Sequence, residues 1–261
     1  MAVKGAVLGD ILGSQYEFWR PKDLDWKHVE LLRSEYAAFT DDTVMMLAIK
    51  KAILDGTDLV DTMVEVGRKY ENCGYGGTFY HWITTDNHKP YNSWGNGSAM
   101  RVTFVGEYFD DYEVMQKMAE KTAEVSHNHP EGIKGAVVTA TCVWMAKHGK
   151  SKENIYNYVL SEYPTEKYQY SIEHSLEEIR PTYKFDVSCQ GSVPVAMRCF
   201  YESTDYESFI RNIYSLDCDS DTFGAIAGGV TEEYYHGFGN VPAKGILECF
   251  LTDDLLEILM R

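Results

Sequence analysis

Two short runs of acidic and hydroxyl residues, far apart in the sequence, have the composition of a cation site. Thr40-Asp41-Asp42-Thr43 precedes one apolar segment with helical spacing, and Asp219-Ser220-Asp221-Thr222 precedes another. Such runs also cap helices, since their oxygens accept hydrogen bonds from the first helical amides and their charges suit the helix dipole. Adjacent aspartates repel each other unless a cation intervenes. For the first run alone, a cap and a metal site both remain open.

The second run moves the interpretation towards a metal site. Aspartates at positions i and i+2 with a hydroxyl at i+3 can converge on one ion from a turn, and a small-residue helix follows from Phe223 to Gly229. We therefore expect two helix N-termini to face each other across a shared site. All the donors are hard oxygens, which favours Mg²⁺, Mn²⁺ or Ca²⁺ over zinc.

A glycine-rich segment near the N-terminus carries two further carboxylates. Gly9 and Gly13 are four residues apart, and Asp10, Gly13 and Glu17 would share one face of a helix. Glycine costs an exposed helix about 1 kcal/mol relative to alanine, so its repetition here predicts a close approach of backbones. The alternative is that Asp10 merely caps a helix and that Glu17 is solvated.

A Gly-Asn-Gly turn lies within Ser93-Trp94-Gly95-Asn96-Gly97-Ser98, directly before a short apolar segment. Exposed amides at a helix start attract phosphate, so this turn is a candidate anion site that needs no basic patch. His127 and His129 follow downstream and could pair on a metal. Because a proline follows His129, we favour a polar contact for His127 and a structural role for His129.

The elements that must position these residues are helices. Apolar residues recur at helical spacing in ten segments, and alternating strand patterns are scarce. The expected helices are Asp42–Leu54, Leu59–Tyr70, Asp111–Val125, Glu131–His148, Lys152–Leu160, Ile172–Ile179, Pro194–Tyr201, Tyr206–Tyr214, Asp221–Tyr235 and Pro242–Phe250. Residues 72–97 form the one long irregular stretch, whose aromatic content indicates a functional, ordered loop. We predict an all-α orthogonal bundle of about ten or more helices, in a single domain of residues 1–261.

The overall composition narrows the class of partner. The chain has 261 residues, with 24 Lys and Arg against 40 Asp and Glu, a formal charge of −16. This charge disfavours nucleic-acid and anionic membrane partners, although most of it is expected to be a solvated acidic surface. The six scattered cysteines contain no CxxC pair, which indicates reduced thiols rather than a disulfide framework. No transmembrane or signal segment is evident, so a cytoplasmic location is expected.

Taken together, the motifs resemble the ADP-ribosylglycohydrolase family. The resemblance rests on six short motifs that follow the family order along the whole chain: GDILGSQYE (9–17), TDDT (40–43), GNGSAMR (95–101), SHNHPEGIKGA (126–136), GSVPVA (191–196) and DSDT (219–222). Each motif is weak alone, and the ordered set is specific.

The resemblance implies an all-α fold with two Mg²⁺ or Mn²⁺ ions in a cleft, and hydrolysis of the glycosidic bond between ADP-ribose and an acceptor. The acceptor would be an ADP-ribosylated protein or a small molecule. By position in the motifs, the metal ligands would be Thr40, Asp41, Asp42, Asp219, Asp221 and Thr222. Glu17 would act as ligand, gate or base, and Glu17 or Asp42 would orient or deprotonate the attacking water. Ser93, Gly95, Asn96 and Gly97 would hold the diphosphate, Trp94 would stack on adenine, and His127 would contact phosphate or ribose.

One departure from the family pattern lies beside the second acidic run. Asp217 and Cys218 stand where relatives commonly have two glycines, which raises the question of whether an extra carboxylate reaches the metals. The alternatives to a glycohydrolase are a non-catalytic ADP-ribose-binding module of the same fold, a phosphohydrolase that cuts the pyrophosphate, and a purely structural bundle.

Overall fold

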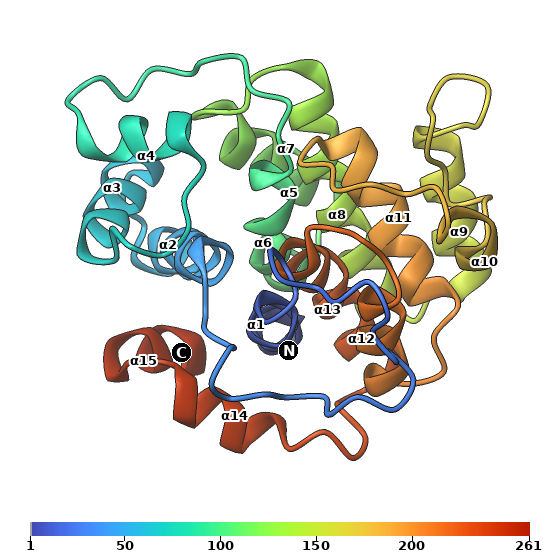
Figure 1. Cartoon of the computed structure of the whole chain (residues 1–261). Coiled ribbons are helices and arrows are strands. Elements are labelled where there is room, and N and C mark those ends of the chain that lie inside the picture. Colours follow the sequence, from blue (N-terminus) through green and yellow to red (C-terminus); the bar gives the residue numbers. More distant parts are fainter. Residues whose placement is uncertain (1) are drawn as a thin grey trace.

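The computed structural model describes residues 2–261, and this part of the chain is all-helical, as predicted (Figure 1). It contains fifteen helices and no strand: α1 (Ala2–Ser14), α2 (Asp41–Asp55), α3 (Leu59–Lys69), α4 (Gly77–Thr84), α5 (Gly97–Met100), α6 (Thr103–Tyr108), α7 (Tyr112–Glu124), α8 (Pro130–Lys147), α9 (Lys152–Glu162), α10 (Leu176–Ile179), α11 (Cys189–Tyr201), α12 (Tyr206–Tyr214), α13 (Ser220–Tyr235), α14 (Ala243–Phe250) and α15 (Asp253–Met260). No helix within residues 2–261 is long and apolar enough to cross a membrane.

α1 and α13 form the most extensive helix pair of the described chain, and α1 lies near the middle of the view in Figure 1. Glycines make this contact: Gly5 faces Gly228, and Gly9 faces Gly224. A Cβ atom built on Gly9 would lie only 2.5 Å from the carbonyl carbon of Gly224. The close approach predicted from the glycine spacing is therefore present, and it brings the N-terminal segment against a helix near the other end of the chain.

The buried apolar residues form two groups that share α8. One group surrounds α1, α11, α12 and α13, and the other joins α2, α3, α4 and α7. α8 contributes Val138 to the first group and Ala140 to the second. The acidic motifs lie where α1 and α13 of the first group meet the N-terminus of α2 from the second.

Most of the predicted helices are found within a few residues of their expected bounds, but four expectations need correction. The segment Ile172–Ile179 becomes helical only at α10, because Ser175 and Glu178 form a capping box that begins the helix there. The irregular stretch 72–97 contains α4, which the glycines and aromatic residues of that segment concealed. α15 was not predicted at all, although Asp253 and Asp254 mark its first turn.

The fourth correction concerns α1. The helix ends at Ser14, and the chain turns at Tyr16, whose amide donates to the carbonyl of Gly13 (3.0 Å). Glu17 therefore lies in the loop beyond the helix and does not continue the helical face of Asp10.

Candidate metal centre and cleft

The first acidic run begins α2 as a true helix cap. Thr40 has extended backbone angles, and its side-chain oxygen accepts from the amide of Asp42 (3.3 Å). Asp41 and Asp42 occupy the first turn, where negative charge is favoured by the helix dipole. The cap does not use the carboxylates, which remain available for a further role.

Asp10, in the interior of α1, accepts hydrogen bonds from the N-terminus of α2. It is fully buried and accepts from the amide and hydroxyl of Thr40 (3.0 and 2.8 Å) and from the amide and hydroxyl of Thr43 (3.2 and 2.5 Å). Burial raises the pKa of Asp10 to about 6, although these hydrogen bonds act in the opposite direction. Asp10 thus fixes the N-terminus of α2 against α1.

The second acidic run begins α13 and is anchored by neighbours. Ser220 donates to the carbonyl of Gly13 (2.7 Å), and the side-chain amide of Asn96 donates to Asp219 (2.8 Å). The hydroxyl of Thr222 lies 3.4 Å from Asp42 Oδ2, which links this run to the first. The two helix N-termini therefore meet, as the sequence predicted.

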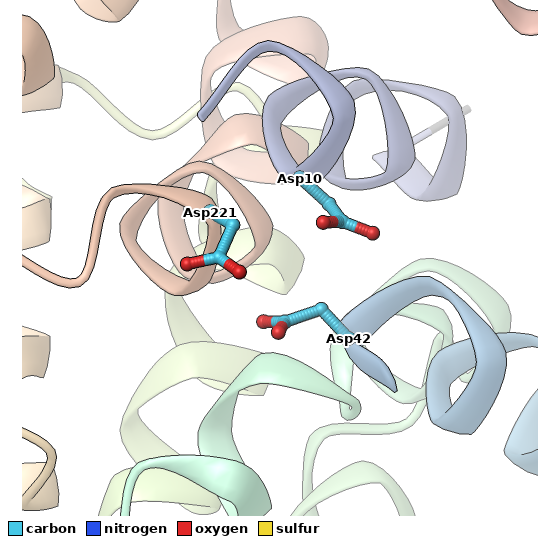
Figure 2. Close-up of side chains that lie close together, drawn as sticks. All are labelled: Asp10, Asp42 and Asp221. Carbon is cyan, nitrogen blue, oxygen red and sulfur yellow. The ribbon is translucent and has the colours of Figure 1, made fainter. Parts of the chain in front are cut away.

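Five carboxylates converge between these helices. Asp10, Asp42 and Asp221 each place an oxygen within 4.8 Å of the others, and Figure 2 shows their side chains pointing towards one another from α1, α2 and α13. Glu17, Asp219 and Asp221 form a second such group, so Asp221 belongs to both. Each of these two groups could hold a metal ion.

The electrostatics show that these carboxylates need a positive partner. Burial, followed by the neighbouring carboxylates, raises the pKa values of Asp42 and Asp221 well above their usual range. Burial and Asp219 raise the pKa of Glu17 to about 7. Asp42 Oδ1 is moreover buried without a hydrogen-bond partner among the described residues. Protons or hard divalent cations would relieve this repulsion, and the all-oxygen donor set fits Mg²⁺ or Mn²⁺.

The remaining predicted ligands are placed differently. Asp41 lines the cleft, and its amide donates to the carbonyl of Cys73 (2.7 Å), but its side chain belongs to neither carboxylate group. The hydroxyl of Thr40 is engaged with Asp10. The structure brings Asp42, Asp219 and Asp221 together with Glu17. The hydroxyl of Thr40 also lies 3.1 Å from Asp42 Oδ2. Burial, followed by Asp10, Asp219 and Glu17, raises the pKa of Asp41 well above its usual range.

A cleft of about 730 Å³ opens above the carboxylates. The Gly-Asn-Gly turn lines it, together with Trp94 and His127. Within the turn, the amide of Gly95 donates to Ser93 Oγ (3.1 Å) and the amide of Asn96 to the carbonyl of Val187 (2.8 Å). These two amides are therefore committed within the protein.

The amides at the start of α5 remain available to an anion. Those of Gly97 and Ser98 have no acceptor among the described residues. Asn96, predicted to hold the diphosphate, instead uses its side chain on Asp219 and on Ser192 Oγ (3.0 Å). It therefore orients a carboxylate of the metal centre.

The aromatic and imidazole groups of the cleft occupy distinct positions. The Trp94 side chain is about half-exposed (52%), with its ring edge-to-face with His129 (5.5 Å between centroids). His129 accepts from the amide of Glu131 (3.1 Å) as the N-cap of α8, the structural role expected for it. His127 is buried beneath the Gly-Asn-Gly turn, and burial lowers its pKa well below the usual value.

The side chains of Asp217 and Cys218, which depart from the family pattern, make their contacts outside the candidate metal centre. Asp217 is exposed and lies 3.8 Å from Lys184 Nζ in an ion pair. Cys218 is buried and its thiol contacts the carbonyl of Ile213 (3.7 Å). All six cysteines are unpaired, in agreement with the expectation of free thiols.

Asp10 is the main functional residue that sequence reasoning undervalued. Its position on a helical face with Gly13 and Glu17 was recognised from the sequence, but the alternative for Asp10 was a simple helix cap. The available signal was an aspartate between glycines in an apolar helix, where an unpaired buried charge would be costly. Such a position implies partners on another element, which here are Thr40 and Thr43.

Comparisons with known proteins agree with this arrangement. The sequence profile described as ADP-ribosylglycohydrolase matches residues 1–260. The chain is similar to the ADP-ribosylhydrolase ARH3 of Homo sapiens (28% identity, covering 98% of this chain and 91% of ARH3) and of Gallus gallus (26% identity, covering 94% and 87%). A solved structure titled "ADP-ribosylglycohydrolase-related protein complex" shares the fold, with a TM-score of 0.75, 21% identity and coverage of 98% of this chain and 93% of that one. The chain therefore belongs to the ADP-ribosylglycohydrolase family.

Proposed function

We propose that this protein hydrolyses the glycosidic bond between ADP-ribose and an acceptor, with two divalent cations, Mg²⁺ or Mn²⁺, at the base of the cleft. The observation that carries the proposal is the convergence of Glu17, Asp42, Asp219 and Asp221 below a cleft lined by a tryptophan and a Gly-Asn-Gly turn. The ARH3 relatives, named as ADP-ribosylhydrolases, support the same activity. The acceptor would be a protein side chain or a small molecule.

Asp42, Asp219, Asp221 and Glu17 would hold the cations, with Thr40, Asp41 and Thr222 close by. Bound there, the cations would supply affinity for the ribose hydroxyls and a lowered pKa of a coordinated water. The pair of groups fits two cations because only Asp221 is common to both.

The protein's own groups account for the rest of the chemistry. Glycosidic cleavage passes through an oxocarbenium-like state that a nearby carboxylate stabilises. Glu17 lies in a loop rather than in a helix and shares a carboxylate group with Asp219 and Asp221, so it is placed to orient or deprotonate a water there. Asp42, which is held in the first turn of α2, is the alternative for orienting that water.

Substrate binding is assigned to the cleft wall. The amides of Gly97 and Ser98 would donate to the diphosphate, with Ser93 and Gly95 shaping the turn. Trp94 would stack on the adenine at the cleft mouth. This arrangement explains how a chain of charge −16 can bind an anionic ligand, because amides and cations replace a basic patch.

The test is release of ADP-ribose from arginine-linked and serine-linked substrates, in Mg²⁺ and in EDTA. Cation-dependent release of ADP-ribose from either linkage would support the proposal and identify the acceptor. Release of AMP would indicate a phosphohydrolase, and tight ADP-ribose binding without any cleavage would indicate a binding module. Both of these results would overturn the proposal.

A matched pair of variants tests the metal centre. Asp219→Asn removes a charge from the carboxylate group while keeping the hydrogen-bonding shape, and turnover is expected to fall by two or more orders of magnitude. Asp217→Asn makes the same change two residues away on the surface and should leave turnover unchanged. Equal activity in the two variants would exclude Asp219 from the mechanism.

A further inference from the structure

The His127 ring is held in one orientation by its neighbours. It contacts the rings of Phe79 and Tyr91, with centroid distances of 6.2 and 5.8 Å. Nε2 faces the Gly-Asn-Gly turn, since a Cβ built on Gly97 would lie 3.1 Å from it. Nε2 makes no hydrogen bond to any described residue, whereas Nδ1 lies 2.8 Å from Ser126 Oγ. One ring nitrogen is therefore bound to the protein and the other is presented to the cleft.

Ser126 also contacts a buried cation, and this fixes the direction of its hydrogen bonds. Arg101 Nη2 donates to Ser126 Oγ (2.9 Å) and to the carbonyl of Thr122 (2.8 Å). A guanidinium has only donors, so the serine oxygen accepts from it. The only acceptor within reach of the serine proton among the described residues is His127 Nδ1. A proton on Nδ1 would leave the hydroxyl proton of the fully buried Ser126 without an acceptor, which is costly, so the geometry favours an unprotonated Nδ1 with the ring proton on Nε2.

Arg101 itself has the properties of a positioning group. Its side chain is fully buried, it lies over the Phe79 ring (5.4 Å), and its Nε and Nη1 atoms have no hydrogen-bond partner within residues 2–261. A buried positive charge so near the imidazole opposes a second positive charge on the ring. Arg101 therefore favours the neutral ring, and Ser126 selects which neutral tautomer it adopts.

We propose that Arg101 and Ser126 are positioning residues that lock His127 as a neutral Nε2–H donor aimed at the cleft beside Gly97. The group recognised would be an oxygen that only accepts hydrogen bonds, such as a phosphate oxygen of the nucleotide. This step rests on the proposed function for the identity of the ligand. The tautomer itself is a property of the ligand-free protein.

The direct test is long-range ¹H–¹⁵N spectroscopy of the histidine rings in the ligand-free protein, with the His127 signals assigned by their loss in His127→Gln. We expect a neutral ring protonated at Nε2. A ring protonated at Nδ1, or at both nitrogens at pH 7, would overturn the proposal. The tautomer is measured on the wild-type protein, and the His127→Gln variant is needed only for the assignment.

Ser126→Ala tests the relay, with Ser215→Ala as its control. Ser215 is also a buried serine, but its hydroxyl donates to the carbonyl of Asn212 (2.6 Å) and it lies outside the cleft lining. The tautomer preference should be lost in Ser126→Ala, retained in Ser215→Ala and restored in Ser126→Thr. An unchanged tautomer in Ser126→Ala would refute the relay.

Titration with ADP-ribose separates this inference from the proposed function. Loss of one hydrogen bond from an oriented donor should weaken ADP-ribose binding on the order of fivefold in Ser126→Ala. Wild-type protein that shows the Nε2–H tautomer but does not bind ADP-ribose would contradict the proposed ligand and leave the relay standing. ADP-ribose binding that is equally tight in both serine variants would show that His127 is not a donor to the ligand.

Discussion

The glycine contact between α1 and α13 predicts opposite effects for one substitution made at two sites. Gly9 lies in α1 against the backbone of Gly224, whereas Gly245 lies in α14 with nothing within 4 Å of a Cβ built on it. Gly9→Ala and Gly245→Ala each add one methyl group inside a helix. The first adds it against a neighbouring backbone and the second adds it to open space.

The magnitude at Gly9 follows from the geometry. The added carbon would lie 2.5 Å from the carbonyl carbon of Gly224, so ordinary contact at 3.4 Å requires the helices to separate by about 0.9 Å (3.4 − 2.5). Overpacking typically costs about 1–3 kcal/mol, and a backbone neighbour has no rotamer with which to relieve it. Alanine recovers about 1 kcal/mol of helix propensity. Because the Gly224 backbone cannot move aside as a side chain could, we take the upper end of the overpacking range and expect a net loss of about 2 kcal/mol for Gly9→Ala (3 − 1). For Gly245→Ala we expect a gain of up to about 1 kcal/mol.

Thermal melting of the three proteins in the same buffer measures both effects. For a chain of this size, 1 kcal/mol corresponds to about 2–4 °C in Tm. Gly9→Ala should therefore melt about 4–8 °C below the wild type, and Gly245→Ala up to a few degrees above it. A Gly9→Ala protein that melts at or above the wild-type temperature would refute the reasoning, because helix propensity would then outweigh the contact.

Three further predictions concern other sites. Trp94→Ala should raise KM about tenfold through lost base stacking. Trp19 is also exposed but lies outside the cleft lining, so Trp19→Ala should leave KM unchanged; equal KM values in the two variants would contradict the stacking of Trp94 on adenine. Burial raises the pKa of Glu232 from its usual 4.5 to about 7, so the folded protein loses stability as pH rises from about 4.5 to about 7. In thermal melts across this range, Glu232→Gln should remove up to about 3 kcal/mol of that loss; an unchanged pH dependence would assign the loss to other groups. Lys152 donates to three carbonyls at the end of α11, so Lys152→Met should lower the free energy of unfolding, measured by chemical denaturation, by about 2 kcal/mol. Lys244 is exposed, and an effect of Lys152→Met no larger than that of Lys244→Met would contradict this.

The parts of the site that sequence could predict are those encoded locally. The starts of α2 and α13 follow from hydroxyl and acidic residues placed directly before apolar helical segments. The glycines of α1 predicted a close helix contact because glycine is otherwise unfavourable there. Each of these signals lies within about one or two helical turns of the feature that it predicts.

The parts that sequence could not predict depend on contacts between distant segments. Asp10 binds Thr40 and Thr43 only because α1 packs beside the start of α2. Asn96 was expected to face a phosphate, yet it holds Asp219, which lies 123 residues further along the chain. Glu17 was placed on a helical face, although its helix ends at Ser14. Residue spacing alone carries no information on any of these contacts.

The pairing of α1 with α13 also affects how the protein forms during translation. α1 is synthesised 206 residues before α13 begins (Ser14 to Ser220, 220 − 14). Until then the glycine face of α1 has no neighbour, and Asp42 of α2 faces Asp10 of α1 without the third member of its group, Asp221 of α13. Contacts that are distant in sequence slow folding, and apolar surface that waits for a partner is a substrate for chaperones. A nascent chain that stops before α13 would contain the helices on one side of the cleft and would lack the helix that packs against α1 and supplies Asp221.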